Sequence, residues 1–195
     1  MTAPREIAMK LIEATSMLGD PRAEDPLVPT LSQADYYRIA CPMLFACRRC
    51  GTCCRTGDPI KLREDDVKRI ARHLRITPSR AMKRYVARRV SESGKSFLAM
   101  KHTRPCRFYD ESTTGCSIYE ARPWSCRIFP FLGIYGSEDA VKVHTSCPGS
   151  IEAVKALTGA LSELKESGYS STDDPDVVRR ARRWFDEALL KLSPE

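Results

Sequence analysis

The sequence has no apolar run long enough to cross a membrane, and residues 1–25 lack the apolar stretch of a secretory signal peptide. The longest apolar segments, such as residues 128–134, are far too short for a membrane span. Internal repeats and low-complexity tracts are also missing, which excludes repeat architectures. We therefore expect a cytoplasmic protein with no membrane partner, in a compartment that keeps thiols reduced.

The sequence also lacks paired carboxylates, a nucleophile triad and a glycine-rich phosphate loop, so no familiar hydrolase or nucleotide-binding chemistry is indicated. Histidine is scarce, with only His73, His102 and His144. His102 and His144 lie shortly before Cys106 and Cys147, so each is a candidate metal ligand or a hydrogen-bond donor behind one. The plainer interpretation of both is an ordinary histidine at a strand end.

What is present is typical of a soluble globular protein: 195 residues, of which 42% are hydrophobic and 29% charged. The net charge of +7 reflects a basic block at residues 61–89, where only Glu64, Asp65 and Asp66 are acidic. The basic residues of this block are Lys61, Arg63, Lys68, Arg69, Arg72, Arg75, Arg80, Lys83, Arg84, Arg88 and Arg89. Such a block can bind nucleic acid, an acidic protein or an anionic cofactor, or it can be a solvated helical face. The absence of interleaved exposed aromatics argues against binding of single-stranded nucleic acid.

Apolar periodicity predicts a mainly α-helical chain with a small β-sheet, the α+β class, in which flanking helices surround a cysteine-rich, loop-rich metal-binding core. Thr77 and Pro78 have the residue types of a helix N-cap and a first helical position. Helices are expected at residues 3–18, 63–74, 78–90, 150–166 and 175–192, and two mutually paired strands at 97–102 and 140–144. The expected segments are an N-terminal helix and linker (1–43), a cysteine-cluster domain (44–149) and a C-terminal helical hairpin packed on it (150–195).

Nine cysteines in a reducing compartment favour metal ligation over a disulfide scaffold, the plainer competitor. Two-residue gaps let the first three thiolates of the first cluster surround one centre, and Gly51 permits the tight loop that this requires. Cys47, Cys50 and Cys53 reproduce the first three ligands of a bacterial ferredoxin-type run. In that run the further cysteine precedes a proline, as Cys147 does here.

Neighbouring residues rarely both ligate one tetrahedral ion, so Cys53 and Cys54 are expected to serve different metals. A second set of four thiolates would consist of Cys54, Cys106, Cys116 and Cys126. Four thiolates suit either zinc or iron–sulfur chemistry, so two zinc sites, two clusters, one of each, or a single larger cluster stay open. Cys41 lies outside both sets, and its simpler interpretation is a small buried apolar residue.

Five motifs occur in a fixed order between residues 44 and 149. They are Phe45-Ala-Cys47-Arg-Arg-Cys50-Gly51-Thr-Cys53-Cys54-Arg55, Pro105-Cys106-Arg-Phe108, Gly115-Cys116-Ser-Ile118-Tyr119, Arg122-Pro123-Trp-Ser-Cys126-Arg127-Ile-Phe129-Pro130 and Cys147-Pro148-Gly149. Together they resemble the YkgJ-type cysteine-cluster family, whose members are described as zinc- or iron-chelating and are often called Fe–S oxidoreductases. The resemblance implies eight metal ligands: Cys47, Cys50, Cys53, Cys54, Cys106, Cys116, Cys126 and Cys147.

The resemblance also favours iron over zinc, as an iron–sulfur cluster of the 4Fe–4S type. In the arginine-proline-cysteine motif, Arg122 and Arg127 are candidates to hydrogen-bond the cluster sulfurs or to hold the loop. Trp124 and Phe129 would shield the metal from water or simply pack.

Three functions remain as alternatives, because family membership alone does not define a reaction. The leading hypothesis is an iron–sulfur protein that transfers electrons or handles clusters for a protein partner. The second is a zinc-stabilised interaction module whose basic face, residues 61–90, binds an acidic partner or RNA. The third is a cluster-dependent methyltransferase-like enzyme, by analogy with the flagellin lysine-N-methylases, larger relatives with a similar cysteine set. The chain shows no motif of its own for S-adenosylmethionine.

Overall fold

The computed structural model describes residues 3–27, 31–56, 60–101, 103–131 and 144–192. It is 53% helical and 9% strand, which confirms the predicted mainly α class with a small sheet. Contacts divide the chain into two compact units, one made of Met1–Ala46 with Pro130–Glu195 and the other of Cys47–Phe129. This grouping joins both ends of the chain into one unit, and the expected three-segment division stays a prediction. Within the described ranges, no helix has the length and apolar character needed to cross a membrane.

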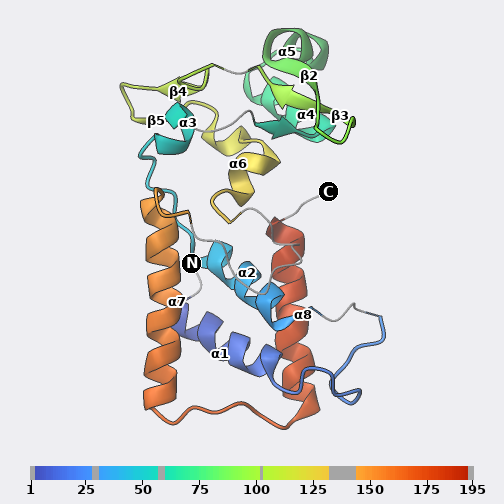
Figure 1. Cartoon of the computed structure of the whole chain (residues 1–195), viewed down its shortest axis with the longest axis vertical. Coiled ribbons are helices and arrows are strands. Elements are labelled where there is room, and N and C mark those ends of the chain that lie inside the picture. The colour runs from blue at the N-terminus through green and yellow to red at the C-terminus, as the bar shows by residue number, and fades with distance from the viewer. Residues whose placement is uncertain (1–2, 28–30, 57–59, 102, 132–143, 193–195) are drawn as a thin grey trace. The chain divides into compact units, whose positions relative to one another are not determined.

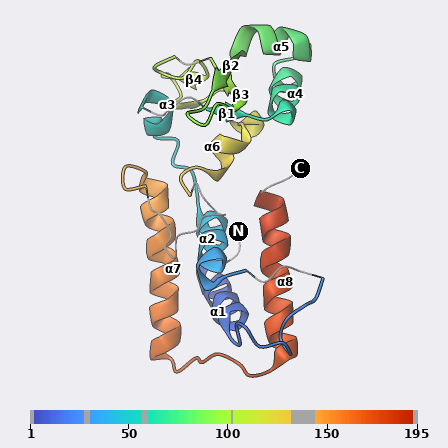
Figure 2. The same cartoon turned by 45° about the vertical axis from the view of Figure 1, so that its right-hand side comes forward.

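The first unit is a bundle of helices in which α7 and α8 run antiparallel on either side of α1 and α2 (Figures 1 and 2). The helices are α1 (Pro4–Thr15), α2 (Gln33–Leu44), α7 (Pro148–Glu166) and α8 (Pro175–Leu192). Their apolar faces meet in one core, which buries Ile7, Leu11, Tyr36, Ile39, Leu157, Leu164 and Phe185. The helices expected at 3–18, 150–166 and 175–192 are therefore confirmed apart from small differences at their ends.

Helix α2 begins with a capping box, which explains why the chain turns into a helix at this point. The Ser32 side chain accepts a hydrogen bond from the Asp35 amide, and the Asp35 carboxylate accepts one from the Ser32 amide at 3.1 Å. This exchange satisfies two amides that a helix start leaves without partners. At α7 a proline, Pro148, occupies the first turn, where its missing N–H costs nothing.

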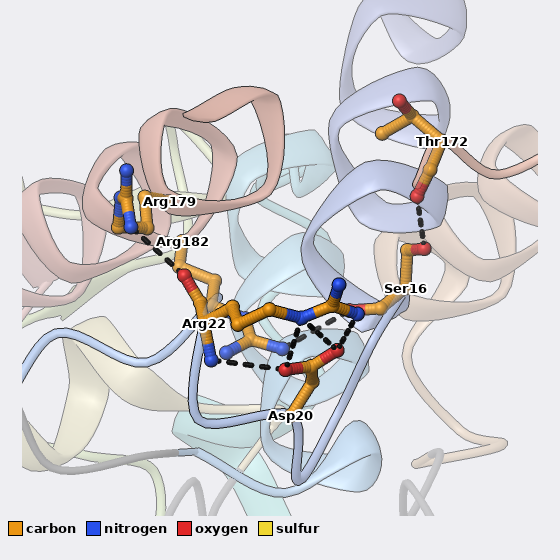
Figure 3. A network of polar contacts seen from close by, with 6 residues as sticks. All are labelled: Ser16, Asp20, Arg22, Thr172, Arg179 and Arg182. Atoms are coloured by element: carbon orange, nitrogen blue, oxygen red, sulfur yellow. Dashed lines mark hydrogen bonds and ion pairs between the residues drawn. The ribbon is translucent and has the colours of Figure 1, made fainter. Parts of the chain in front are cut away.

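A buried arginine, Arg182 of α8, holds the end of α1 and the segment that follows it (Figure 3). Its Nε donates to the Ala14 carbonyl at 3.0 Å and its Nη2 to the Ser16 carbonyl at 3.0 Å. Its Nη1 contacts the Ala23 carbonyl at 3.3 Å and the Glu24 carboxylate at 2.8 Å. One guanidinium therefore satisfies one carbonyl in the last turn of α1 and two carbonyls beyond it.

Polar contacts around Arg182 extend this network. The Ser16 hydroxyl donates to the Thr172 carbonyl at 2.6 Å, and Arg179 donates to the Arg22 carbonyl at 2.8 Å (Figure 3). These bonds tie the segment after α1 to the start of α8.

The second unit contains a three-stranded antiparallel sheet in the order β1-β3-β2, a small ribbon of β4 and β5, and short helices. Its strands are β1 (Lys61–Leu62), β2 (Val86–Val90), β3 (Ser96–Met100), β4 (Tyr109–Asp110) and β5 (Gly115–Cys116). Its helices are α3 (Thr52–Thr56), α4 (Glu64–His73), α5 (Pro78–Tyr85), the 3₁₀ helix η1 (Tyr119–Ala121) and α6 (Trp124–Ile128). A second core packs α4 and α5 against one face of the sheet and buries Leu62, Val67, Ile70, Tyr85, Val86 and Met100.

The helix expected at 63–74 is confirmed as α4, and the predicted start of the next helix is confirmed in detail. The Thr77 side chain accepts a hydrogen bond from the Arg80 amide at 3.3 Å, and Pro78 takes the first helical position. The expected end at residue 90 is wrong. Helix α5 ends at Tyr85, and Val86 begins β2, because this segment pairs along its whole length with β3.

The strand expected at 97–102 is confirmed as β3, although His102 lies outside the described residues. In the structure β3 is the central strand and pairs with β1 and β2, whereas the partner expected for it was the segment 140–144. Residues 140–143 of the other expected strand lie outside the described ranges.

Candidate metal centre

The cysteine loop at the start of the second unit depends on left-handed backbone at two positions. Gly51 has φ +72°, and a Cβ atom there would lie 2.4 Å from a ring carbon of Tyr109. Arg49 has φ 51°, and its guanidinium lies 4.2 Å from the centre of the Tyr119 ring. The structure therefore confirms that Gly51 is required by the loop, for both its backbone angle and its lack of a side chain.

Two further segments are tied to this loop by backbone contacts. The Cys106 amide donates to the Cys54 carbonyl at 2.7 Å, and the Tyr109 amide donates to the Cys106 carbonyl at 2.8 Å. Tyr109 of β4 then pairs with Cys116 of β5. Backbone hydrogen bonds thus bring together three cysteines that are far apart in sequence, Cys54, Cys106 and Cys116.

The thiols of this region interact electrostatically. Hydrogen bonding from the Cys54 thiol, helped by the positive charge of Arg122, lowers the pKa of Cys53 to about 6 against the opposing effect of burial. The pKa of Cys54 shifts in the opposite direction. Its hydrogen bond to Cys53 and its burial raise this pKa well above the ordinary range. Cys53 is therefore the thiol of this pair that ionises first.

Cys106, Cys116 and Cys126 belong to the same group. Burial is the largest effect on each and raises its pKa, and a Cys53 thiolate nearby raises each pKa further. Burial raises the pKa of Cys126 above the ordinary range, and negative charge on Cys106 and Cys116 also raises it. Five of the eight predicted ligands therefore interact with one another, and all nine cysteines are free thiols.

The remaining three predicted ligands are placed differently. The Cys50 thiol is exposed and contacts the Thr52 hydroxyl at 3.4 Å, and Cys47 is half-buried at the start of the unit. Cys147 belongs to the other unit, where it is the N-cap residue of α7. Across the described ranges, no three His, Cys, Asp or Glu side chains are arranged to hold one ion as they stand. The grouping into two sets of four ligands stays a prediction, and metal binding would require the thiols to draw closer together.

Arg122 lies beside these thiols, as the predicted role requires. Its positive charge lowers the pKa values of Cys53, Cys116 and Cys126. Its guanidinium stacks on the Tyr119 ring at 3.6 Å from the ring centre, and its Nε donates to the Tyr119 carbonyl at 3.0 Å. This fixed positive charge favours a site that carries several thiolates.

Arg127 lies in a different environment, beside other charged groups of α4. Its burial, followed by the positive charge of Arg69, holds the pKa of the Arg127 guanidinium below its usual range, and the Asp66 charge acts in the opposite direction. Its Nε is buried and has no hydrogen-bond acceptor among the described residues. The same is true of the indole Nε1 of Trp124.

These two buried donors lie on α6, the helix that also carries Cys126. An unsatisfied buried N–H is costly, and sulfur atoms of a metal cluster accept hydrogen bonds from such donors. Five interacting thiols with a fixed arginine charge beside them therefore fit a thiolate-bound metal centre.

One important residue was missed by the sequence analysis: Asp66, which was taken only as one of three acids in the first turn of α4. Its side chain is 2% exposed and lies in the second unit's interior. One carboxylate oxygen accepts the Trp124 amide at 2.9 Å and pairs with Arg69, and the other accepts the Arg63 amide at 2.9 Å. Arg69 also donates to the Arg122 carbonyl at 3.0 Å.

This buried acid therefore connects α4 to the segment that carries Arg122, Trp124 and Cys126. A signal was present in the sequence, because Asp66 lies four residues before Ile70 and so shares the buried face of α4. An acid on an apolar helix face needs partners from elsewhere in the fold.

Of the two candidate histidines, His102 lies outside the described residues and His144 belongs to the first unit. His73, which was not a candidate, is exposed and lies 3.4 Å from the Ser117 carbonyl. His144 contacts the Ser146 hydroxyl at 2.9 Å, and its carbonyl accepts the Ser150 hydroxyl at 2.7 Å at the start of α7.

Cys41 is buried in the helical core of the first unit, with 2% of its surface exposed. Burial raises the pKa of this thiol to about 11, so it is protonated at neutral pH and is a poor ligand. We expect Cys41→Ala to leave the metal content unchanged and to cost about 1–2 kcal/mol of unfolding free energy, because it removes one buried sulfur from a packed core. Metal analysis and urea unfolding of the purified variant measure the two quantities, and a lower metal-to-protein ratio in the folded variant would make Cys41 a ligand.

Comparison with known proteins places the cysteine segment in context. The family model CxxCxxCC, described as "Putative zinc- or iron-chelating domain", matches residues 46–148. The match confirms the predicted resemblance to a metal-chelating cysteine-cluster family.

A relative in Methanocaldococcus jannaschii, named "Uncharacterized protein MJ0661", is 33% identical to this chain over 87 residues. The alignment covers 45% of this chain and 44% of that protein, so the chain spans less than half of that relative's length. No solved structure matches.

Proposed function

The chain belongs to the CxxCxxCC family and is a metal-binding cysteine-cluster protein, and from this premise we propose that it holds an iron–sulfur cluster and transfers electrons to or from a protein partner. The observation that carries the proposal is the group of five interacting thiols, Cys53, Cys54, Cys106, Cys116 and Cys126. A bound iron–sulfur cluster supplies one-electron chemistry at a potential that depends on its charge, hydrogen bonds and exposure.

The adjacency of Cys53 and Cys54 favours a polynuclear centre over a single structural zinc. A structural zinc ion takes its four ligands in a tetrahedron around one atom. Cys53 and Cys54 are adjacent on the first turn of α3, so a common tetrahedral ion would strain the backbone. A polynuclear centre accommodates adjacent thiolates on different metal atoms.

The surroundings favour a centre with acceptor atoms of its own. Arg122 supplies a positive charge beside the thiolates. Arg127 and Trp124 each have a buried N–H group that finds no hydrogen-bond acceptor among the described residues. Inorganic sulfide would accept such bonds, whereas a zinc ion ligated only by cysteine has no sulfide to offer. In this proposal Arg122 and the two donors raise the reduction potential by stabilising the more negative, reduced state.

Anaerobic purification followed by iron, zinc and acid-labile sulfide analysis tests the proposal directly. We expect a coloured protein with iron and sulfide in equal amounts and an EPR signal after dithionite reduction, as a 4Fe–4S cluster gives. Cys126→Ser should lose most of the visible absorbance, and Cys41→Ser should retain it as the matched control. A colourless protein with stoichiometric zinc would overturn the proposal and leave the zinc-stabilised module in its place.

A further inference from the structure

One face of the three-stranded sheet is not covered by α4 and α5 and carries basic and aromatic side chains together. Side chains alternate between the two faces of a strand. Leu62, Val86 and Met100 face the core beneath α4 and α5. Lys61 pairs with Ala99 and Arg89 pairs with Phe97, so Lys61, Arg89 and Phe97 share the opposite face.

The Phe97 ring is half-buried on this face, and the Trp124 ring of α6 is half-buried beside Arg63, which follows β1; each ring lies beside a cation. Lys61 Nζ lies 5.2 Å from the centre of the Phe97 ring, and the Arg63 guanidinium lies 4.0 Å from the centre of the Trp124 ring. Lys61, Arg63 and Arg89 are exposed. We call these five residues, Lys61, Arg63, Arg89, Phe97 and Trp124, the sheet surface.

Phe97 lies in the middle of the sheet surface, with a basic residue on each neighbouring strand. Arg89 of β2 is directly opposite it, and Lys61 of β1 approaches from the other side. The acids near these charges in the sequence are Asp58, Glu64, Asp65, Asp66 and Glu92. Asp65 pairs with Lys68, and Asp66 pairs with Arg69. Among the described residues, no ion pair neutralises Lys61, Arg63 or Arg89.

The geometry points to a binding site for single-stranded nucleic acid on the sheet surface, with a base stacked on Phe97 and the flanking phosphates held by Lys61 and Arg89. Stacking on an aromatic ring beside cations that track the backbone is how proteins bind unpaired strands without reading sequence. A duplex hides the faces of its bases in the stack, so it could contact only the charged side chains of the sheet surface. An acidic protein would likewise leave the exposed part of the Phe97 ring without a function.

Sheet pairing supplies the aromatic ring that the basic block lacks in the sequence. The basic block contains no exposed aromatic between its charges, but sheet pairing brings Phe97 from outside the block to lie between Lys61 and Arg89. The proposed nucleic-acid site does not depend on which metal the cysteines hold.

Fluorescence anisotropy with a fluorescein-labelled oligouridylate of 15 nucleotides tests the site, with the anaerobic metal-loaded protein in low salt. We expect Phe97→Leu to weaken binding about tenfold, because leucine keeps the apolar packing and removes the stacking ring. Phe97→Tyr should bind as the unmodified protein does. Lys61→Gln and Arg89→Gln should each reduce the slope of log affinity against log salt by about 0.7.

Arg80→Gln is the matched control, because it removes the same charge from α5, which packs on the other face of the sheet. It should weaken binding less than Arg89→Gln. Far-UV circular dichroism and thermal melting confirm that each variant is folded. If leucine disturbs the sheet, the salt dependence of Lys61→Gln and Arg89→Gln still tests the site.

Three results would overturn the inference. The first is no binding of the oligouridylate by the unmodified protein. The second is equal binding by folded Phe97→Leu, or equal affinity for a duplex RNA of the same length. The third is tighter binding of polyglutamate than of the oligouridylate, which would make the surface a site for an acidic protein.

Discussion

An Asp66→Ala variant should lose about 2–4 kcal/mol of unfolding free energy and most of its bound metal. The carboxylate is buried and accepts hydrogen bonds from the Arg63 and Trp124 amides as well as from Arg69. Alanine would leave both amides without this acceptor and would remove the ion pair with Arg69, which keeps its bond to the Arg122 carbonyl. Each buried unsatisfied donor costs about 1–3 kcal/mol. The loss should fall on the segment that carries Cys126, because Asp66 is its link to α4.

The measurement takes advantage of the two tryptophans, since Trp124 lies in the second unit and Trp184 in the first. In a Trp184→Phe background, fluorescence of Trp124 alone reports urea unfolding of the second unit. Metal analysis of the same preparations gives the fraction of metal that the protein retains. Asp65→Ala is the control: Asp65 is 61% exposed and pairs with an exposed Lys68, so its loss should cost less than about 1 kcal/mol. If both variants retain stability and metal equally, Asp66 does not position the metal-binding segment.

Arg182→Met should destabilise the helical unit by about 3–5 kcal/mol, because it removes one partner of a buried ion pair together with several buried hydrogen bonds. Methionine keeps much of the side-chain volume, but the carbonyls of Ala14, Ser16 and Ala23 and the Glu24 carboxylate all lose their donor. Metal content should stay unchanged, because these contacts lie wholly in the first unit.

Urea unfolding followed by Trp184 fluorescence, in a Trp124→Phe background, measures this effect. Arg183→Met is the neighbouring control, since Arg183 is 67% exposed and its ion pair with Asp25 lies at the surface. Its loss should cost less than about 1 kcal/mol. Equal stability of the two variants would show that the carbonyls around Arg182 find other donors.

The helices were largely predictable from the sequence, because local patterns determine them. Thr77 and Pro78 marked the start of α5, and the apolar spacing of Val178 and Phe185 marked α8. The end of α5 was missed because Arg88 and Arg89 are acceptable in a helix, and their strand conformation comes from pairing with β3. Local propensity could not reveal a partner that lies beyond a turn.

The candidate site was predictable only as a set of cysteines. Their spacing identified the eight candidates, and the structure brings five of them together through contacts such as the Cys106 amide on the Cys54 carbonyl. The residues that support the site were not visible in the same way. Asp66 and Phe97 act through tertiary contacts, with α6 and with β1, that no pattern within their own segments encodes.

The division of the chain has a consequence for its synthesis on the ribosome. The metal-binding unit, Cys47–Phe129, is translated completely before α7 and α8 exist, whereas α1 and α2 must wait for those two helices to complete their core. The five interacting thiols therefore emerge while the helical bundle still lacks two of its helices, and the predicted ligand Cys147 follows only at the start of α7. Metal thus has access to those five thiols before the bundle closes.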